Sequence, residues 1–410
     1  MFENWSIPAV HVRSNPGTSA HSNPSATATG AIVLGGDCGA LGVARSLGRQ
    51  GIAVLFLSSG NPLAAWSRYA RHLRWPGADH AGATGWLIDL ARRRGLDGWL
   101  LIPCGDAEVR LVAQHHAELA AVFRLCTPSW DITRWAADKN LTYQKAAEIG
   151  IDFPRTYEVT HADQLAALGC RFPIILKPAV KQGRNALTSS KAWQVDDEAG
   201  LRRRFDEALT LAGSGGLIVQ ELIPGGGASQ FSYAAVCKDG EPVLSMVARR
   251  ARQYPSDFGT GCYVETVEDA TLEALAERFI RAIGYSGMVE MEFKRDDRDG
   301  AYKLLDVNPR VWTWNALGQV AGVDFPLTMW NVAGGRAVPR RRAPAGVAWM
   351  YVSRDLPVVL RAMLAGDLSV RDYLSAFRRP LGFATFAADD PLPALADLPL
   401  VLLRRLRPER

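Results

Sequence analysis

The chain has 410 residues, which is too long for one ordinary domain, so two or three packed units are expected. Hydrophobic residues make up 48% and charged residues 22%, as in a globular protein, and no apolar run is long enough to suggest a membrane-spanning helix. The formal net charge of +5 is modest for this size and does not require a nucleic-acid partner.

Cysteine and histidine usage excludes several kinds of site. The six cysteines are scattered without a C-x-x-C pair, which disfavours a disulfide framework and a zinc site and suits a reducing cytoplasm. All seven histidines lie at or before His161. Chemistry in the rest of the chain must therefore use carboxylates, lysine and arginine.

The first part of the chain predicts a tail followed by a parallel α/β unit. Residues 1–29 are rich in Ser, Asn, Thr and Pro and are expected to be a disordered tail. Residues 30–130 form the α/β unit, with strands expected at Ala31–Leu34, Ile52–Leu57 and Trp99–Ile102.

Glycines follow the first of these strands. The spacing Gly36-x-x-Gly39-x-x-Gly42 is wrong for the dinucleotide fingerprint, and no acidic residue ends the second strand. A tight strand-to-helix turn is favoured over a nicotinamide site, although an oxidoreductase stays open as an alternative. Asp106, at the end of the third strand, is a candidate substrate contact.

Residues 131–335 predict an α+β unit with antiparallel sheets. It begins with a helical stretch around Trp130–Glu148, and further helices are expected at Glu198–Ala212 and Asp269–Ile283. Its expected strands are Ile174–Leu176, Leu217–Gln220, Phe231–Cys237, Pro242–Val247, Met288–Phe293 and Tyr302–Val307.

Residues 336–410 form a basic C-terminal extension. Leu398–Arg407 combines leucines with arginines, which indicates a packed surface helix or, alternatively, a helix that meets a membrane surface or a partner.

The segment Gly287–Arg310 predicts a β-hairpin that carries a cation site. A turn centred on Asp299 pairs Glu292 with Asp306 and Glu290 with Asn308, and places all four side chains on one face. Directly opposed carboxylates repel each other unless a cation lies between them, and Mg²⁺ prefers such oxygen ligands. An acidic exposed strand is the alternative.

Two lysines are candidates for binding anions. Lys177 ends an apolar strand between prolines, where a charge is costly unless it meets a partner; a structural salt bridge is the alternative. Lys139 begins a helix and could equally be solvated. Leu217–Gly225 is an apolar strand that stops at Glu221, so the backbone of Leu222 and Ile223 is available to a flat heterocycle.

In this order, these pieces resemble the ATP-grasp superfamily over roughly residues 30–335. The phrases GGDCGALGVARSLGRQGI, RQYPSDFGTGCYVETV and YKLLDVNPR are similar to predicted ATP-dependent carboligases related to biotin carboxylase and carbamoyl phosphate synthase. The resemblance implies a pre-ATP-grasp α/β domain followed by an ATP-grasp fold.

The resemblance also implies roles for the candidate residues. Magnesium, as one or two ions with Mn²⁺ as an alternative, would bind to Glu292, Asp306 and Asn308, while Glu290 is not the usual ligand. Arg310 and Lys177 would serve catalysis. ATP would be held by Lys139, Lys177, Gln220, Glu221, Leu222, Ile223 and Ser229.

The implied chemistry activates a carboxylate as an acyl phosphate, which an amine or other nucleophile then attacks, releasing ADP. Arg249, Arg250 and Arg252 lie in Arg249–Gly261, which is expected to be a substrate-facing loop, and guanidinium groups suit a carboxylate. The partners would be a small-molecule carboxylate and a nucleophile, with no nucleic acid, in a cytoplasmic enzyme for which a homodimer is one option. A kinase-like enzyme and a non-catalytic nucleotide-binding regulator remain alternatives.

Overall fold

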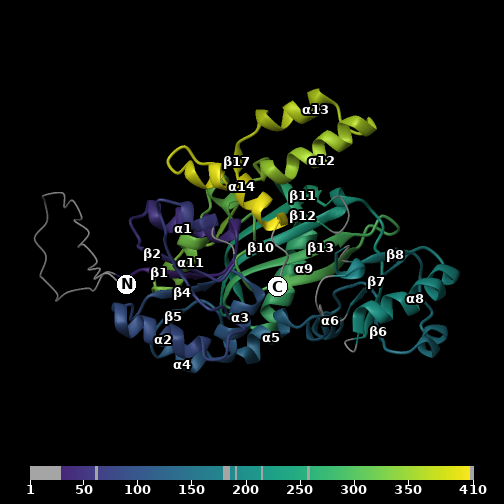
Figure 1. Ribbon diagram of the computed structural model, residues 1–410, viewed down its shortest axis with the longest axis horizontal. Coiled ribbons are helices and arrows are strands. Elements are labelled where there is room, and N and C mark those ends of the chain that lie inside the picture. The colour runs from purple at the N-terminus through teal and green to yellow at the C-terminus, as the bar shows by residue number, and fades with distance from the viewer. Residues whose placement is uncertain are drawn as a thin grey trace, which may run out of the picture.

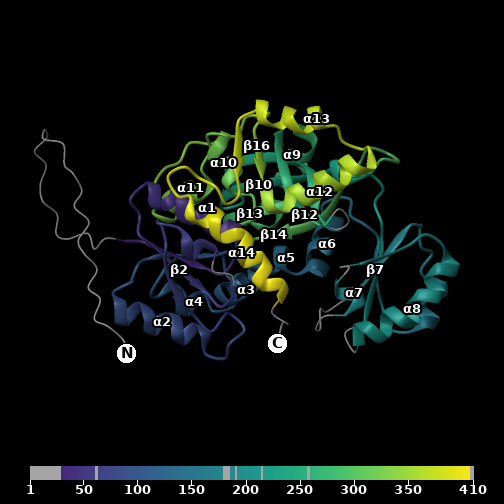
Figure 2. The ribbon, with the colours of Figure 1, turned by 45° about the horizontal axis from the view of Figure 1, so that its top comes forward.

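The computed structural model describes residues 29–60, 63–178, 185–189, 192–213, 216–255 and 259–406. The predicted tail therefore lies outside the described residues except for Thr29, as does most of the stretch from Lys181 to Lys191. In Figures 1 and 2 the first sheet lies toward the N-terminal side, a large sheet occupies the centre, and a small lobe lies on the opposite side.

The first sheet is parallel, as predicted, with the strand order β3-β2-β1-β4-β5. Its strands are β1 (Ala31–Leu34), β2 (Val54–Ser58), β3 (Arg71–Arg74), β4 (Leu100–Pro103) and β5 (Arg124–Leu125). The helices between them are α1 (Cys38–Arg49), α2 (Ala83–Arg94), α3 (Asp106–Gln114) and α4 (His116–Ala120). The order of the strands reverses between β1 and β4, and ligands bind at such a switch point in open parallel sheets.

The glycines after β1 have two different structural roles. Gly36 has a φ of +82°, which makes the tight turn that the sequence predicted. Gly39 and Gly42 lie in α1, where an added Cβ would come within 3.0 Å of the Trp312 carbonyl oxygen and 2.6 Å of Asn315 Oδ1. These glycines therefore let α1 approach the segment that follows the predicted hairpin.

The central sheet has eight strands, in the order β14-β13-β10-β11-β12-β16-β17, with β15 beside β11. Its apolar residues pack on one side with the helix α9 and on the other with α1, α10 and α11. The strands are β10 (Gln230–Lys238), β11 (Glu241–Tyr254), β12 (Thr260–Val267), β13 (Gly287–Arg295), β14 (Tyr302–Asn308), β15 (Arg341–Arg342), β16 (Ala348–Met350) and β17 (Leu381–Phe383). The helices are α9 (Ala270–Ile283), α10 (Ala316–Val320) and α11 (Phe325–Ala333).

The small lobe is an antiparallel sheet, as predicted, with the order β6-β9-β7-β8. Its strands are β6 (Thr156–Val159), β7 (Ile174–Pro178), β8 (Trp193–Val195) and β9 (Leu217–Glu221). The helices α7 (Ala186–Ser189) and α8 (Glu198–Ala212) belong to the same lobe. The lobe has a hydrophobic core of its own, in which α8 packs on the sheet.

Two predicted elements were wrong in detail. The helical stretch Trp130–Glu148 breaks at Asp138 into α5 (Trp130–Ala137) and α6 (Lys139–Glu148), because the Asp138 side chain accepts hydrogen bonds from the first amides of α6 as its N-cap. The segment Arg249–Gly261 is not a loop throughout, since β11 extends to Tyr254 and β12 begins at Thr260. The three arginines Arg249, Arg250 and Arg252 therefore lie on a strand.

The C-terminal segment is integrated into the fold. Strands β16 and β17 extend the central sheet, while α12 (Val352–Ala365) and α13 (Val370–Ser375) project from it as a pair (Figure 1). Helix α14 (Leu392–Leu406) lies across the first unit near α1 (Figure 2), as the predicted surface helix.

Candidate active site

The hairpin of β13 and β14 has the predicted register at its polar end. Glu292 faces Asp306 and Glu290 faces Asn308 across the two strands. Nearer the turn the register shifts by one residue, so that Phe293 pairs with Leu304. The shift is a β-bulge between the two pairings, which the simple turn model did not foresee.

On this face, neighbouring side chains stabilise the ionised form of Glu292. Its Oε2 atom lies 3.1 Å from Arg250 Nη2 and accepts a hydrogen bond of 2.9 Å from Gln230. Burial opposes its charge, but Arg250 outweighs burial and lowers the pKa of Glu292. Glu292 therefore stays ionised where a cation could meet it.

Glu290 lies deeper and is only 2% exposed. Its Oε2 atom accepts a hydrogen bond of 2.7 Å from Asn308, while Oε1 has no hydrogen-bond partner among the described residues. Burial and the neighbouring charge of Glu292 raise the pKa of Glu290. The carboxylates of Glu290 and Glu292, which lie two residues apart on the same face of β13, thus repel each other.

Asp306 meets Lys139 across the edge of the hairpin, at 3.7 Å between Oδ1 and Nζ. Burial raises the pKa of Asp306, and the charge of Glu292 acts in the same direction against the counter-effect of Lys139. For Lys139, burial opposes the charge, but Asp306 and Tyr143 outweigh it and raise the pKa. Lys139 is thus fixed as a cation beside the predicted metal ligands.

Lys177 lies on β7, and its hydrogen-bond partner among the described residues is neutral. Its Nζ atom donates a hydrogen bond of 2.9 Å to Gln220 Oε1. Burial, assisted by the charge of Lys139, lowers the pKa of Lys177 to about 8. The structural salt bridge that was the alternative is absent among the described residues, so within them this half-buried ammonium group has no anionic partner.

Gln220 holds Lys177 in place. Gln220 is 5% exposed, and its amide nitrogen donates to Thr156 Oγ1 at 2.7 Å and to the Tyr143 hydroxyl at 3.2 Å. Because protein groups occupy both ends of the amide, Gln220 fixes the lysine position rather than offering a free group to a ligand.

The end of β9 presents backbone and an ion pair. Glu221 Oε1 lies 2.6 Å from Arg298 Nη2, which comes from the β13–β14 turn. The backbone amide of Leu222 donates a hydrogen bond of 3.0 Å to the Pro173 carbonyl. The backbone amide of Ile223, the other one predicted to meet a ligand, has no partner in the described part of the chain. The Ser229 hydroxyl donates a hydrogen bond of 3.2 Å to Asp297 Oδ1.

The three arginines on β11 differ in how fully they are paired. Arg250 is 7% exposed and bridges Glu292 and the Gly259 carbonyl. Arg252 forms a bidentate pair with Asp355, at 2.7 and 2.9 Å, and lies over the Tyr263 ring. Arg249 contacts Glu265 at 3.2 Å, but its buried Nε has no partner among the described residues. The fold thus occupies Arg252, which leaves it poorly placed for a substrate.

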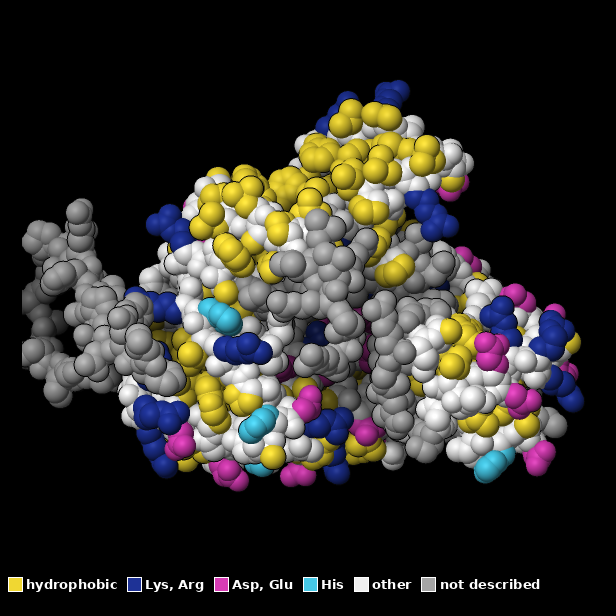
Figure 3. All heavy atoms as spheres, viewed as in Figure 1, with side chains coloured by type: hydrophobic (Ala, Val, Ile, Leu, Met, Phe, Trp, Pro, Cys, Tyr) yellow, Lys and Arg dark blue, Asp and Glu magenta, His cyan; other side chains and the backbone are white. Residues whose placement is uncertain are grey.

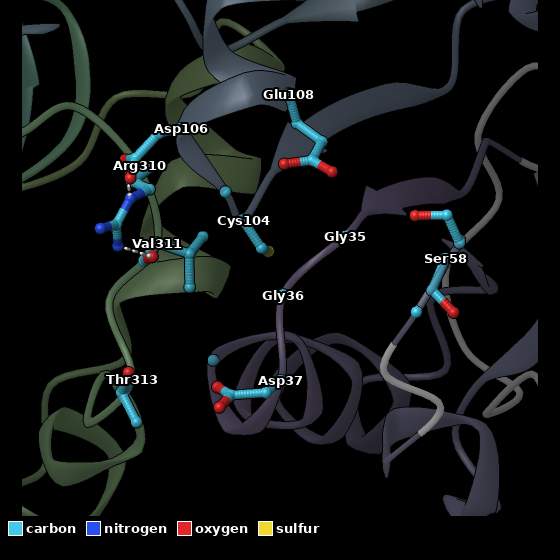
Figure 4. A pocket seen from close by; sticks show the side chains of 14 residues that line it. Gly35, Gly36, Asp37, Ser58, Cys104, Asp106, Glu108, Arg310, Val311 and Thr313 are labelled. Carbon is cyan, nitrogen blue, oxygen red and sulfur yellow. Dashed lines mark hydrogen bonds and ion pairs between the residues drawn. The ribbon is translucent and has the colours of Figure 1, made fainter. Parts of the chain in front are cut away.

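A cavity of about 410 Å³ opens beside this polar face, at the switch point of the first sheet. Figure 4 shows its walls: the Gly35–Asp37 turn after β1, the beginning of α3, and Arg310 from the segment after β14. Arg310 donates to Asp106 and, at 3.0 Å, to Asn308 Oδ1. Arg310 therefore belongs both to the cavity wall and to the hairpin face, and it brings the candidate Asp106 to the same place.

Sequence reasoning missed Glu108, which also lines the cavity. A Cβ added at Gly35 or at Gly105 would come within 2.5 and 2.2 Å of its carboxylate oxygens, so these two glycines leave room for it. Burial raises the pKa of Glu108, with Asp106 and Asp79 acting in the same direction. Within the described part of the chain no cationic side chain pairs with it. The only sequence signal was its place in the first turn of the helix after β4.

The donor set fits a magnesium ion that is shared with a ligand. No three His, Cys, Asp or Glu side chains of the described residues converge as a metal site of their own. Glu292, Asp306 and Asn308 nevertheless share one face. Burial raises the pKa of Asp306, with the charge of Glu292 acting in the same direction, and a cation on this face would oppose both effects. Mg²⁺ is usually held by one or two carboxylates together with substrate phosphates. The residues present fit that arrangement.

Comparisons with known proteins agree with this geometry. Residues 136–314 match a family model described as "ATP-grasp domain". The chain is 27% identical to D-aspartate ligase from Enterococcus faecium (strain Aus0004) over 308 residues, which span 68% of this chain and 70% of that protein.

Many solved structures have a similar fold, and two of them are compared with this chain. One is the biotin carboxylase–β,γ-ATP complex from Campylobacter jejuni. It has a TM-score of 0.58 and 18% identity, and the match covers 78% of this chain and 74% of that chain. The L-amino acid ligase from Bacillus licheniformis has a TM-score of 0.56 and 15% identity over 74% of each chain.

Proposed function

We propose, from the match of residues 136–314 to the ATP-grasp domain model, that the chain is an ADP-forming, Mg²⁺-dependent carboxylate–amine ligase. The observation that carries the proposal is the dual position of Arg310. It hydrogen-bonds Asn308 on the polar hairpin face and also lines the 410 Å³ cavity. A phosphoryl group on the hairpin face and a carboxylate in the cavity would therefore meet at one guanidinium group.

In this proposal the small lobe and the hairpin enclose ATP. Lys139 and Lys177 bind its phosphates, since both are half-buried cations, and the partner of Lys177 among the described residues is neutral. The adenine lies against the end of β9, where the Ile223 amide is available, with Glu221, Leu222 and Ser229 nearby. Gln220 holds Lys177.

Glu292, Asp306 and Asn308 would hold Mg²⁺ in contact with the phosphates. The ion neutralises charge on the transferring phosphoryl group when it is bound. The protein's own part is positional: Arg250 keeps Glu292 ionised, and Arg310 stabilises negative charge at the carboxylate that receives the phosphoryl group. A closed site then protects the acyl phosphate from water until the nucleophile attacks.

Glu108 indicates the substrate class. Asp106 is paired with Arg310, and Asp37 with Arg354 at 3.3 Å, so Glu108 is the carboxylate of the cavity wall that the described residues leave unpaired. An ammonium group would neutralise it. We infer that one substrate is an amino acid or a similar amine-bearing acid, and the names of the D-aspartate ligase and of the L-amino acid ligase support this inference. We place the reaction in the cytoplasm, where ATP is available.

The test is a screen of acid and amine pairs for the release of ADP and phosphate. A ligase requires both substrates for turnover, whereas a kinase-like enzyme would release ADP with the acid alone and accumulate a phosphorylated product. Steady ADP formation from a single substrate would therefore replace the ligase with the kinase. Failure of every pair, together with the absence of ATP binding, would remove the enzymatic proposal.

A further inference from the structure

Charged side chains at the start of α12 connect the C-terminal segment to the candidate active site. Arg354 Nη2 lies 3.3 Å from Oδ2 of Asp37, a residue of the cavity wall that is 317 positions away in the sequence. The next residue of the helix, Asp355, pairs with Arg252 on β11. Two successive residues of α12 therefore contact the cavity wall and the strand that carries Arg250.

Helix α12 turns different sides to the solvent and to the active site. Figure 3 shows hydrophobic side chains gathered over α12 on the outer surface, and its exposed apolar residues are spaced four apart from Val352 to Leu364. None of the described helices has both the length and the apolarity to traverse a bilayer. Asp355, in contrast, is fully buried, and the side chain of Arg354 is 23% exposed. The charged contacts of α12 therefore lie on its inner side.

Arg354 is held in place from several directions. Its guanidinium group lies over the Tyr351 ring, 4.5 Å from the centroid, and its Nη1 atom donates a hydrogen bond of 3.3 Å to Thr260 Oγ1 at the start of β12. The Tyr351 hydroxyl in turn donates a hydrogen bond of 2.8 Å to the buried Asp397 of α14. Burial opposes the charge of Arg354, but Asp37 and Tyr351 outweigh burial and raise the pKa of Arg354. The C-terminal helices thus fix this cation beside the cavity.

Asp37 does not make the hydrogen bond that its position favours. It precedes α1, where an aspartate ordinarily caps the helix by accepting from one of the first amides, but its side chain makes no such bond. Its Oδ2 atom meets Arg354, while Oδ1 has no partner within the described ranges. In Figure 4 the carboxylate points from the start of α1 toward the side of the cavity on which Thr313 lies. Asp37 therefore presents an available oxygen to the cavity.

The pairing of Asp37 differs from that of Asp355, which belongs to the interior. Asp355 uses both oxygens for Arg252, at 2.7 and 2.9 Å, whereas Asp37 uses one oxygen for Arg354. A carboxylate accepts several hydrogen bonds, so Asp37 can receive a further donor while Arg354 holds it. An ammonium group has three such donors and can meet two carboxylates at once.

We propose that Arg354 is a positioning residue that holds the Asp37 carboxylate in the cavity wall, where Asp37 and Glu108 together bind an ammonium group of the substrate. The proposal rests on the carboxylate–amine ligase function and gives the C-terminal segment a role in it. Without the guanidinium group, Asp37 would turn to the first amides of α1, since these lack a side-chain cap. The substrate would then meet Glu108 alone.

Steady-state kinetics with the amine-bearing substrate that the acid and amine screen identifies tests the role of the charge. Arg354→Met keeps an apolar stem over Tyr351 but removes the cation, so the KM of this substrate should rise roughly tenfold, with kcat and the KM of ATP nearly unchanged. Arg354→Lys keeps the charge and should recover most of the wild-type KM. Arg361→Met, at an exposed position of the same helix, is the matched control and should behave as the wild type.

A double-mutant cycle tests whether Arg354 acts through Asp37. Asp37→Asn should raise the same KM to a similar extent, and Arg354→Met in that background should add little, because both changes affect one carboxylate. Additive effects would overturn the positioning role. Equal KM values in Arg354→Met and Arg354→Lys would overturn it as well, since the loss would then come from packing.

Crystal structures of the wild type and of Arg354→Met test the positioning without catalysis. In the variant, the Asp37 carboxylate is expected to leave the cavity wall and to accept a hydrogen bond from the amide of Gly39 or Ala40. If Asp37 keeps its place, the proposal is wrong whatever reaction the protein catalyses. If Asp37 moves but no acid and amine pair releases ADP in the wild type, the ligase function fails, and the substrate role of Asp37 fails with it.

Discussion

Two charged clusters of this molecule join residues that are far apart in the sequence, and they differ in how completely their charges are paired. Around Asp390 the cluster is closed: its Oδ2 atom accepts from Arg45 at 2.9 Å and from Ser67 at 2.7 Å, and its Oδ1 atom accepts from the Arg68 amide. Asp390 is 1% exposed.

The second cluster, formed by the hairpin face and its cavity, is open in the sense that several of its charged groups have no oppositely charged partner among the described residues. Lys177 has a neutral partner, one oxygen of Glu290 has none among the described residues, and Glu108 has no cation there. A buried charge that is fully paired holds a fold together, whereas one left unpaired carries a cost that a ligand can relieve. The comparison predicts that substitutions in the open cluster affect activity and those in the closed cluster affect stability.

The largest expected effect is on Lys177→Met. Removing the ammonium group takes away a cation from the phosphates, so ADP release with saturating substrates should fall by roughly a hundredfold to a thousandfold. The melting temperature should change little, because the lost charge had no anionic partner. Lys145→Met, which removes a lysine paired with the exposed Glu148, is the control and should retain activity. If Lys177→Met instead lost much of its stability but kept normal turnover per folded molecule, Lys177 would serve the fold and not the activity.

The closed cluster should respond in the opposite way. Asp390→Ala leaves the buried Arg45 without its carboxylate and should lower the free energy of unfolding by about 3–5 kcal/mol. The neighbouring Asp389→Ala removes an exposed partner of Arg49 and should cost less than about 1 kcal/mol. Chemical denaturation measures both free energies of unfolding. Equal stability of the two variants would contradict the claim that the fully paired cluster around Asp390 stabilises the fold.

Glu108→Gln sharpens the inference about the substrate. The amide keeps the shape of the side chain but loses the charge, so the KM of the amine-bearing substrate should rise roughly tenfold to a hundredfold, while the KM of ATP stays unchanged. Steady-state kinetics with each substrate varied in turn separates the two constants. Glu118→Gln on exposed α4 is the control. If the KM of ATP rose instead, Glu108 would belong to the nucleotide site.

The smallest effect concerns pH. The pKa of Lys177 is lowered to about 8 by burial, so in the free protein its charge is present below that pH and is lost as the pH rises through it. The dissociation constant of ATP at fixed Mg²⁺ should therefore increase above a pH of about 8. Lys177→Arg keeps its charge at every pH tested and should flatten this alkaline limb, even if its affinity is lower. An unchanged limb would assign the titration to another group.

Local patterns were enough to predict much of the fold and the register of the hairpin at its polar end. The limits of Ala31–Leu34 and Glu198–Ala212 were correct to the residue, because apolar runs and caps are encoded locally. The pairing of Glu292 with Asp306 followed from turn position alone. The division at residues 30, 131 and 336 stays a prediction.

Long-range contacts could not be predicted in this way. That Asp355 would occupy Arg252 depends on how α12 packs against β11, 103 residues along the chain. The position of Glu108 in the cavity depends on Gly35 and Gly105, which follow two different strands, and on the approach of Arg310, so no single segment of sequence encodes it. The bulge between the pairings of Glu292 and Phe293 likewise has no signal in the alternation of the strand.

The most direct test of the open hairpin face is the affinity for ATP, measured by calorimetry with and without Mg²⁺ in the wild type and in Glu292→Ala. We expect Mg²⁺ to tighten binding at least about tenfold in the wild type, since it joins carboxylates to phosphates, and to have little effect in the variant. A Glu292→Ala protein that binds ATP with full dependence on Mg²⁺ and turns it over normally would contradict the metal assignment and the account built on it.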